Sequence, residues 1–102
     1  MSTKLVSVVE SIEARLGKLT LGKMIQCIRL CDEISLPDFA KKLGLSKSHL
    51  CDIEKDRKSI SPERAARFAK ILGYSQEQFV QLSLQSLVDR GRLKLNVLVE
   101  AA

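Results

Sequence analysis

Cysteine and histidine are scarce in this chain, and their positions form neither a disulfide nor a metal-binding pattern. The 102 residues include three cysteines and one histidine, His49. An odd number of cysteines without paired spacing argues against a secreted disulfide scaffold. Cys27 and Cys31 lie four residues apart, but no second pair of ligands at zinc spacing accompanies them. We therefore expect small, buried or half-buried thiols and no bound metal.

Long apolar runs are also missing. No segment approaches the roughly 20 apolar residues that a membrane-spanning helix needs. The apolar stretch 5–9 is too short for the core of a signal peptide, because it runs directly into Glu10. We expect a soluble, cytoplasmic protein that does not associate with a membrane.

Patterns typical of catalysis are absent as well. The sequence has no histidine–nucleophile pair, no pair of carboxylates in an evident cleft and no phosphate-binding loop. These absences predict that the protein is not an enzyme and uses no cofactor.

What the chain does have is a localised excess of positive charge. Its net charge is +5, and residues 41–70 carry all of that excess, with nine basic and four acidic side chains. The segments 1–40 and 71–102 are each balanced. A localised basic patch is typical of a surface that binds a polyanion. On charge alone, a solvated basic face is an equally good interpretation.

Apolar spacing and capping residues predict one mostly helical domain. Residues 3–16 have helical spacing, although 5–9 could also be extended because of their β-branched residues. Five further helices are expected, each starting near a serine or threonine cap. Their expected spans are Thr20 to 32–34, Ser35 to Gly44, Ser46 or Lys47 to about Lys55, Ser61 to Gly73, and Ser75 to about Arg90.

The C-terminal tail has a different pattern, that of a half-buried strand. Apolar residues alternate with mostly polar ones in 93–99. An unpaired apolar strand is a liability, so we expect this segment to pair with the same segment of a second chain. A frayed tail, or a partner strand from the N-terminal segment, are the alternatives. The expected dimerisation residues are Leu93, Leu95, Val97 and Val99.

The segment 35–56 has the spacing of two helices joined by a tight turn. A small side chain at Ala40 allows the helices to cross closely, and Gly44 can adopt the positive φ that the turn needs. Leu50 and Ile53 would hold the second helix on the first. The opposite face of the second helix would then point outward, and its N-terminal end could enter a DNA major groove.

These residues resemble the phage-repressor-like, XRE/Cro-type helix-turn-helix proteins over about Leu21 to Leu72. The resemblance implies an all-α fold of four or five helices that binds operator DNA, usually as a homodimer. With the tail included, we expect an all-α, five- to six-helix, repressor-like domain with a short C-terminal strand. Its expected parts are an N-terminal helical extension (1–19), a DNA-binding core (20–74), and a dimerising C-terminal helix and strand (75–102). The matching residues are Arg29, Ser35, Phe39, Ala40, Leu43 to Ser46, Ser48, Leu50, Ile53, Glu54, Ala65, Ala69, Leu72 and Gly73.

The resemblance also implies a set of DNA-binding residues. Lys47 is the first candidate for a base or phosphate contact. Arg57 and Lys58 follow the recognition helix, where the family commonly touches phosphates; a solvated basic loop is the alternative. For Cys51 a packing role is the favoured interpretation, and Glu54 is expected to brace the fold through Arg29. The residues placed on the recognition face are Ser46, Lys47, Ser48, Cys51, Asp52 and Lys55.

The sequence departs from the usual family pattern at three positions. Leu36 stands where a glutamine often contacts the DNA backbone, and Asp56 stands where glycine is common. Asp52 and Asp56 also bring negative charge towards the phosphate-facing surface. The leading prediction is a homodimeric repressor that binds double-stranded DNA and occludes an operator. The alternatives are an antitoxin-type protein that binds a small toxin partner, and a relative of the same fold that has lost DNA binding.

Overall fold

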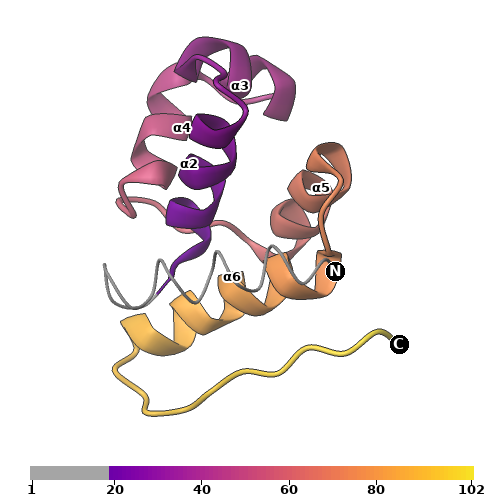
Figure 1. The fold of residues 1–102 in the computed structure, drawn as a ribbon. Coiled ribbons are helices and arrows are strands. Elements are labelled where there is room, and N and C mark those ends of the chain that lie inside the picture. Colours follow the sequence, from indigo (N-terminus) through magenta and orange to yellow (C-terminus); the bar gives the residue numbers. More distant parts are fainter. Residues whose placement is uncertain (1–18) are drawn as a thin grey trace.

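The computed structural model describes residues 19–102, and this range folds into five α-helices (Figure 1). The all-helical prediction is confirmed for these residues. The predicted helix over 3–16 lies outside the described residues. The helices are α2 (Leu21–Cys31), α3 (Leu36–Leu43), α4 (Lys47–Glu54), α5 (Pro62–Leu72) and α6 (Gln76–Arg90).

Each helix begins where the sequence predicts it. The N-cap side chain of every helix accepts a hydrogen bond from the backbone N–H three residues later, which satisfies one of the donors left open at a helix start. α3 and α5 also have a proline in the first turn, where its missing N–H costs little. The five N-caps are Thr20, Ser35, Ser46, Ser61 and Ser75.

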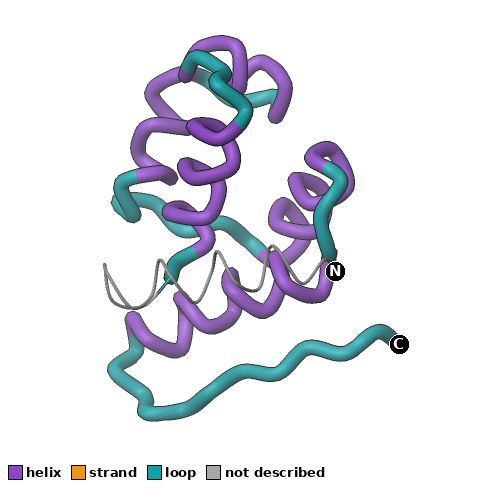
Figure 2. The backbone as a smooth tube through the Cα atoms, viewed as in Figure 1, coloured by secondary structure: helices purple, strands orange, loops and turns teal. Residues whose placement is uncertain are grey.

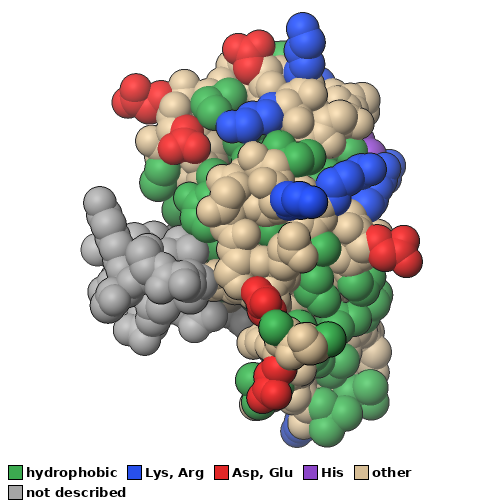
Figure 3. All heavy atoms as spheres, turned by 90° about the vertical axis from the view of Figure 1, so that its right-hand side faces the viewer, with side chains coloured by type: hydrophobic (Ala, Val, Ile, Leu, Met, Phe, Trp, Pro, Cys, Tyr) green, Lys and Arg blue, Asp and Glu red, His purple; other side chains and the backbone are tan. Residues whose placement is uncertain are grey.

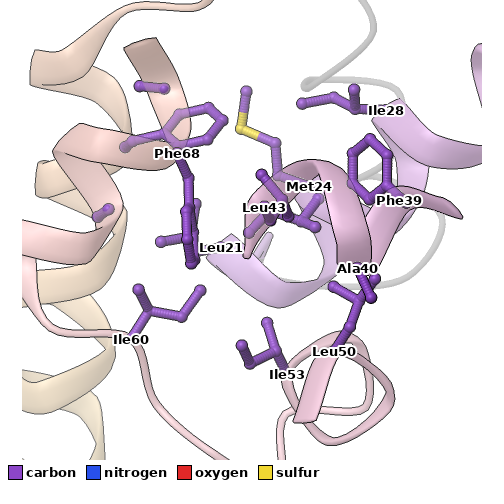
Figure 4. Packing of buried hydrophobic residues seen from close by; sticks show 14 of the residues in the cluster. Leu21, Met24, Ile28, Phe39, Ala40, Leu43, Leu50, Ile53, Ile60 and Phe68 are labelled. Carbon is purple, nitrogen blue, oxygen red and sulfur yellow. The ribbon is translucent and has the colours of Figure 1, made fainter. Parts of the chain in front are cut away.

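One apolar core joins the helices. Phe39 of α3 and Phe68 of α5 are completely buried in it, with Met24 of α2 between them (Figure 4). Leu50 and Ile53 of α4 lie at another side of this core, near Ala40 and Ile60 (Figure 4). The apolar faces predicted from helical spacing therefore meet in one place, and this fixes the orientation of α4 relative to the other helices.

α6 runs across one end of this bundle and packs against α5 and α2 (Figure 1). It is the longest of the described helices, at 15 residues. No helix in the range 19–102 combines the length and the apolar character needed to span a bilayer.

The predicted C-terminal strand is wrong for the single chain. Residues 93–99 run as an extended segment beside α6, and the described part of the chain contains no strand (Figure 2). The physical reason is that a strand needs a neighbouring backbone, which the described part of one chain does not supply. The main chain at Leu95, Val97 and Val99 instead bonds to glutamine side chains of α6.

Candidate nucleic-acid interface

The turn between α3 and α4 has the geometry that the glycine predicts. Gly44 adopts φ +72°, and the N–H of Leu45 donates to the carbonyl of Ala40 at 2.8 Å. This hydrogen bond gives a partner to a carbonyl that would otherwise have none at the end of α3. Leu50 and Ile53 are buried to within 1% of complete, so the inner face of α4 is held against the core. The opposite face of α4 takes no part in the core.

The predicted recognition residues divide into an exposed group and a half-buried group. Lys47 and Ser48, in the first turn of α4, and Lys55, at its end, are exposed. Cys51 and Asp52 are half-buried, which fits the packing role expected for the cysteine. Ser46 is exposed and serves as the N-cap, since its hydroxyl oxygen accepts from the N–H of His49 at 3.1 Å.

The loop after α4 is folded back onto the helix by Asp52. Its carboxylate lies 3.5 Å from an Arg57 Nη1 and 3.8 Å from the Lys58 ammonium. Its backbone carbonyl also accepts the N–H of Arg57 at 2.8 Å. The structure therefore brings Asp52, Arg57 and Lys58 into one cluster, which the sequence analysis did not foresee. The sequence signal for this cluster was an acidic residue near the end of a helix, with basic residues five and six positions later.

Asp56, one of the departures from the family pattern, has a structural role. It adopts φ +59°, in the left-handed region that the usual glycine would occupy. Its carboxylate accepts a hydrogen bond from the Thr20 hydroxyl at 2.7 Å, and Thr20 caps α2. A carboxylate at a helix N-terminus is favoured by the helix dipole. The negative charge of Asp56 thus interacts favourably with the start of α2.

Gly22 explains how α2 comes so close to the end of α4. A Cβ at this position would overlap the carbonyl oxygen of Ile53 and lie 2.7 Å from the Asp56 carboxylate. Only glycine fits this contact without a shift of backbone. The start of α2 and the end of α4 are consequently locked together, and the loop that carries Arg57 begins from a fixed point.

Glu54 braces the fold through Arg29, as the sequence resemblance implied. Two hydrogen bonds, of 2.8 and 3.0 Å, join the guanidinium to the carboxylate. The Nη1 group of Arg29 donates a third hydrogen bond to the carbonyl oxygen of Ile34 at 3.2 Å. The hydrogen bonds that the Arg29 guanidinium donates to the Glu54 carboxylate raise the pKa of Arg29. Glu54 is 3% exposed in its side chain and is not available to DNA.

Leu36 takes part in the core instead of the surface. It is half-buried and packs against the apolar cluster. A glutamine at this position could contact the DNA backbone. Leu36 contributes apolar packing within the protein instead.

α3 and α5 carry further exposed cations. On the face shown in Figure 3, lysine and arginine side chains gather mainly in the upper half, beside the only histidine, His49, and the lower half is more apolar. These bases belong to the positively charged window 41–70, but the helix-turn-helix pattern did not assign them to the site. The exposed ones on α3 and α5 are Lys41, Lys42, Arg64, Arg67 and Lys70.

Comparison with known proteins agrees with this geometry. Residues 33–79 match the family model described as helix-turn-helix, and this range covers α3, the turn, α4 and α5. No curated protein and no solved structure matches the chain. The matched family is one of DNA-binding regulators and not of enzymes. Residues 33–79 therefore form a helix-turn-helix domain of the XRE/Cro type, and this domain supports a role in DNA-binding transcription regulation.

Proposed function

We propose that this protein is a homodimeric repressor that inserts α4 into the major groove of a specific operator. The observation that carries the proposal is the exposed first turn of α4, where Lys47 and Ser48 project from a helix held in place by Leu50 and Ile53. The N-terminal part of a recognition helix is the part that meets base edges in this docking geometry. An operator occupied in this way would be closed to polymerase.

The site residues divide by their chemistry. A lysine can donate to the O6 and N7 acceptors of guanine, and a serine hydroxyl can donate or accept, so Lys47 and Ser48 are proposed to contact bases. Arg57 and Lys58 are proposed to contact phosphates, as is Lys55. Binding would then weaken steeply with salt, since each phosphate contact releases condensed counterions.

Titration of duplex DNA with the Lys47→Ala variant tests this proposal. Loss of a base contact should weaken binding to a selected operator by about 1–3 kcal/mol while leaving binding to random duplex nearly unchanged. Lys70→Ala is the matched control, because it removes the same charge from an exposed position on α5. Equal behaviour of the two variants on operator and random duplex would remove Lys47 from the set of base-contacting residues.

The homodimer is proposed to form through the C-terminal segment. Leu93, Leu95 and Leu98 are 54%, 61% and 83% exposed, although solvent contact at three neighbouring leucines is unfavourable. Symmetric dimers are the usual means by which this motif reaches two half-sites about 34 Å apart. Sedimentation equilibrium of the full chain should give twice the 11.4 kDa chain mass. A monomer at concentrations that saturate the operator would contradict the dimer.

The same exposed segment supports a second candidate, an antitoxin that binds a small partner protein and uses its DNA site for autoregulation. In that case the apolar residues would be covered by the partner and not by a second copy. Co-purification of a stoichiometric small protein from the native cell, with loss of that protein on replacement of Leu95 and Leu98 by serine, would favour this function.

A further inference from the structure

The extended segment 93–99 is held along one edge of its backbone only. Gln85 of α6 donates from Nε2 to the carbonyl of Leu95 at 2.8 Å and accepts the N–H of Val97 at 2.7 Å. Gln81, one turn earlier in α6, accepts the N–H of Val99 at 3.3 Å. The carboxamide of Gln85 thus does what a peptide group of a neighbouring strand would do.

The spacing of the two glutamines explains why they hold an extended chain. Gln81 and Gln85 are four residues apart in a helix, a rise of about 6 Å. Val97 and Val99 are two residues apart in an extended chain, which is about 6.6 Å. The two periods match closely, so both glutamines reach main-chain groups on the same edge. That edge belongs to the odd-numbered residues.

The N–H and C=O groups of the even-numbered residues point to the opposite edge of the segment, and these groups have no hydrogen-bond partner in the described part of the chain. Within the described residues, the main chain of Lys94, Asn96 and Leu98 makes no hydrogen bond. Leu98 is 83% exposed, the highest value among the large apolar side chains of this range. We propose that this open edge pairs, antiparallel, with the same edge of a second copy, about a two-fold axis at Val97. The inference rests on the proposed homodimer and specifies its register.

Backbone geometry restricts the possible registers. Only even-numbered residues present N–H and C=O groups to the partner, so even residues must face even residues across an antiparallel pair. Centring the pair on Val97 places Lys94 opposite Glu100 twice in each dimer. Opposite charges directly across two strands are favourable. Centring it on Asn96 would instead place Lys94 opposite Leu98 and leave Glu100 without a paired cation, because Arg92, its opposite residue, adopts φ +57° and lies outside the extended segment.

Disulfide trapping tests the register directly. In an antiparallel pair, Val97 would face its own copy in the non-hydrogen-bonded position, with Cα atoms about 4.5 Å apart. This separation is within the range that a disulfide can bridge. In full-length protein with Cys27, Cys31 and Cys51 replaced by alanine, Val97→Cys should cross-link into a covalent dimer under mild oxidation. The matched control, Leu95→Cys, should stay uncross-linked, because its proposed partner is Val99.

Charge exchange provides a second measurement that does not depend on thiols. Lys94→Glu and Glu100→Lys should each weaken the dimer about tenfold or more, because each puts like charges opposite each other twice. The double variant should recover most of the loss, as measured by sedimentation. A stable dimer without Val97→Cys cross-linking, or without rescue in the double variant, would overturn the register and leave the homodimer standing. A chain that is monomeric but still binds operator DNA would overturn both the register and the homodimer, and leave DNA recognition by α4 standing.

Discussion

The carboxylate of Asp56 accepts a hydrogen bond from the hydroxyl of Thr20, 36 residues earlier in the chain, at 2.7 Å. This bond ties the start of α2 to the loop that follows the recognition helix. Asp56→Ala should destabilise the protein by about 1–3 kcal/mol, because alanine is strained at φ +59° and also loses the bond. Asp56→Gly should cost less, since it removes only the bond. Chemical denaturation of both variants measures the difference, and an equal cost would show that the left-handed backbone is unimportant.

Gly22→Ala tests the close approach of α2 to α4. Alanine is intrinsically the better helix former, by about 1 kcal/mol. A Cβ here would nevertheless overlap the carbonyl of Ile53, and overpacking typically costs about 1–3 kcal/mol. We expect a net loss of unfolding free energy and weaker operator binding, because α4 must shift. An unchanged Tm of this variant would mean that the start of α2 and the end of α4 can move apart at little cost.

The Arg29–Glu54 pair should be sensitive to single changes and tolerant of a double one. Glu54→Ala leaves a guanidinium that is only 14% exposed without its carboxylate, at a cost of about 3–5 kcal/mol. Replacing both residues by apolar ones, Arg29→Met with Glu54→Leu, should recover much of that loss. A double-mutant cycle by thermal denaturation checks this. Additive losses in the cycle would contradict a direct interaction.

Asp52 should limit how tightly the protein binds DNA of any sequence. It pairs with Arg57 and Lys58, the side chains proposed to contact phosphates. Asp52→Asn should therefore raise affinity for random duplex about three- to tenfold at low salt, since a nearby negative charge is removed. It should change stability by no more than about 1 kcal/mol, because ion pairs between a half-buried carboxylate and exposed cations at 3.5–3.8 Å are weak. Asp32→Asn, an equal charge change at the exposed end of α2, is the control. Reduced affinity of Asp52→Asn would instead show that the carboxylate orients the two cations for binding.

Gln85→Ala should release the C-terminal segment. It removes the carboxamide that bonds both Leu95 and Val97, so the amide of Val97 should lose protection from hydrogen exchange. The dimer should weaken as well, because the segment would have to be ordered on pairing. Gln76→Ala, at the exposed start of α6, provides the comparison. Equal exchange at Val97 in the two variants would contradict the role given to Gln85.

The helices and the turn could be predicted from the sequence because their signals are local. Ser35 and Ser46 cap the residues that directly follow them, and Gly44 closes the helix that it follows. The bond between Asp56 and Thr20 could not be predicted, since nothing near either residue indicates which distant group it meets. Asp56 looked unfavourable for DNA binding only because its partner was unknown.

The C-terminal segment shows a different limit of prediction from sequence. Its alternation correctly indicates an extended backbone, but alternation says nothing about what satisfies that backbone. The bonding groups are Gln81 and Gln85, which lie in a helix and carry no strand signal. The alternation within residues 93–99 therefore predicted an extended backbone correctly, but it did not predict that the segment would lack a partner strand in the single chain.

Selection of bound sequences from a random duplex pool tests DNA recognition by α4 most directly. The full-length protein should enrich one sequence with two-fold symmetry, its half-sites separated by about 34 Å, or one turn of the duplex. Lys47→Ala should lose that enrichment at one base position in each half-site. Failure of the full-length protein to enrich any sequence, at salt low enough for it to bind random duplex, would contradict sequence-specific recognition by α4.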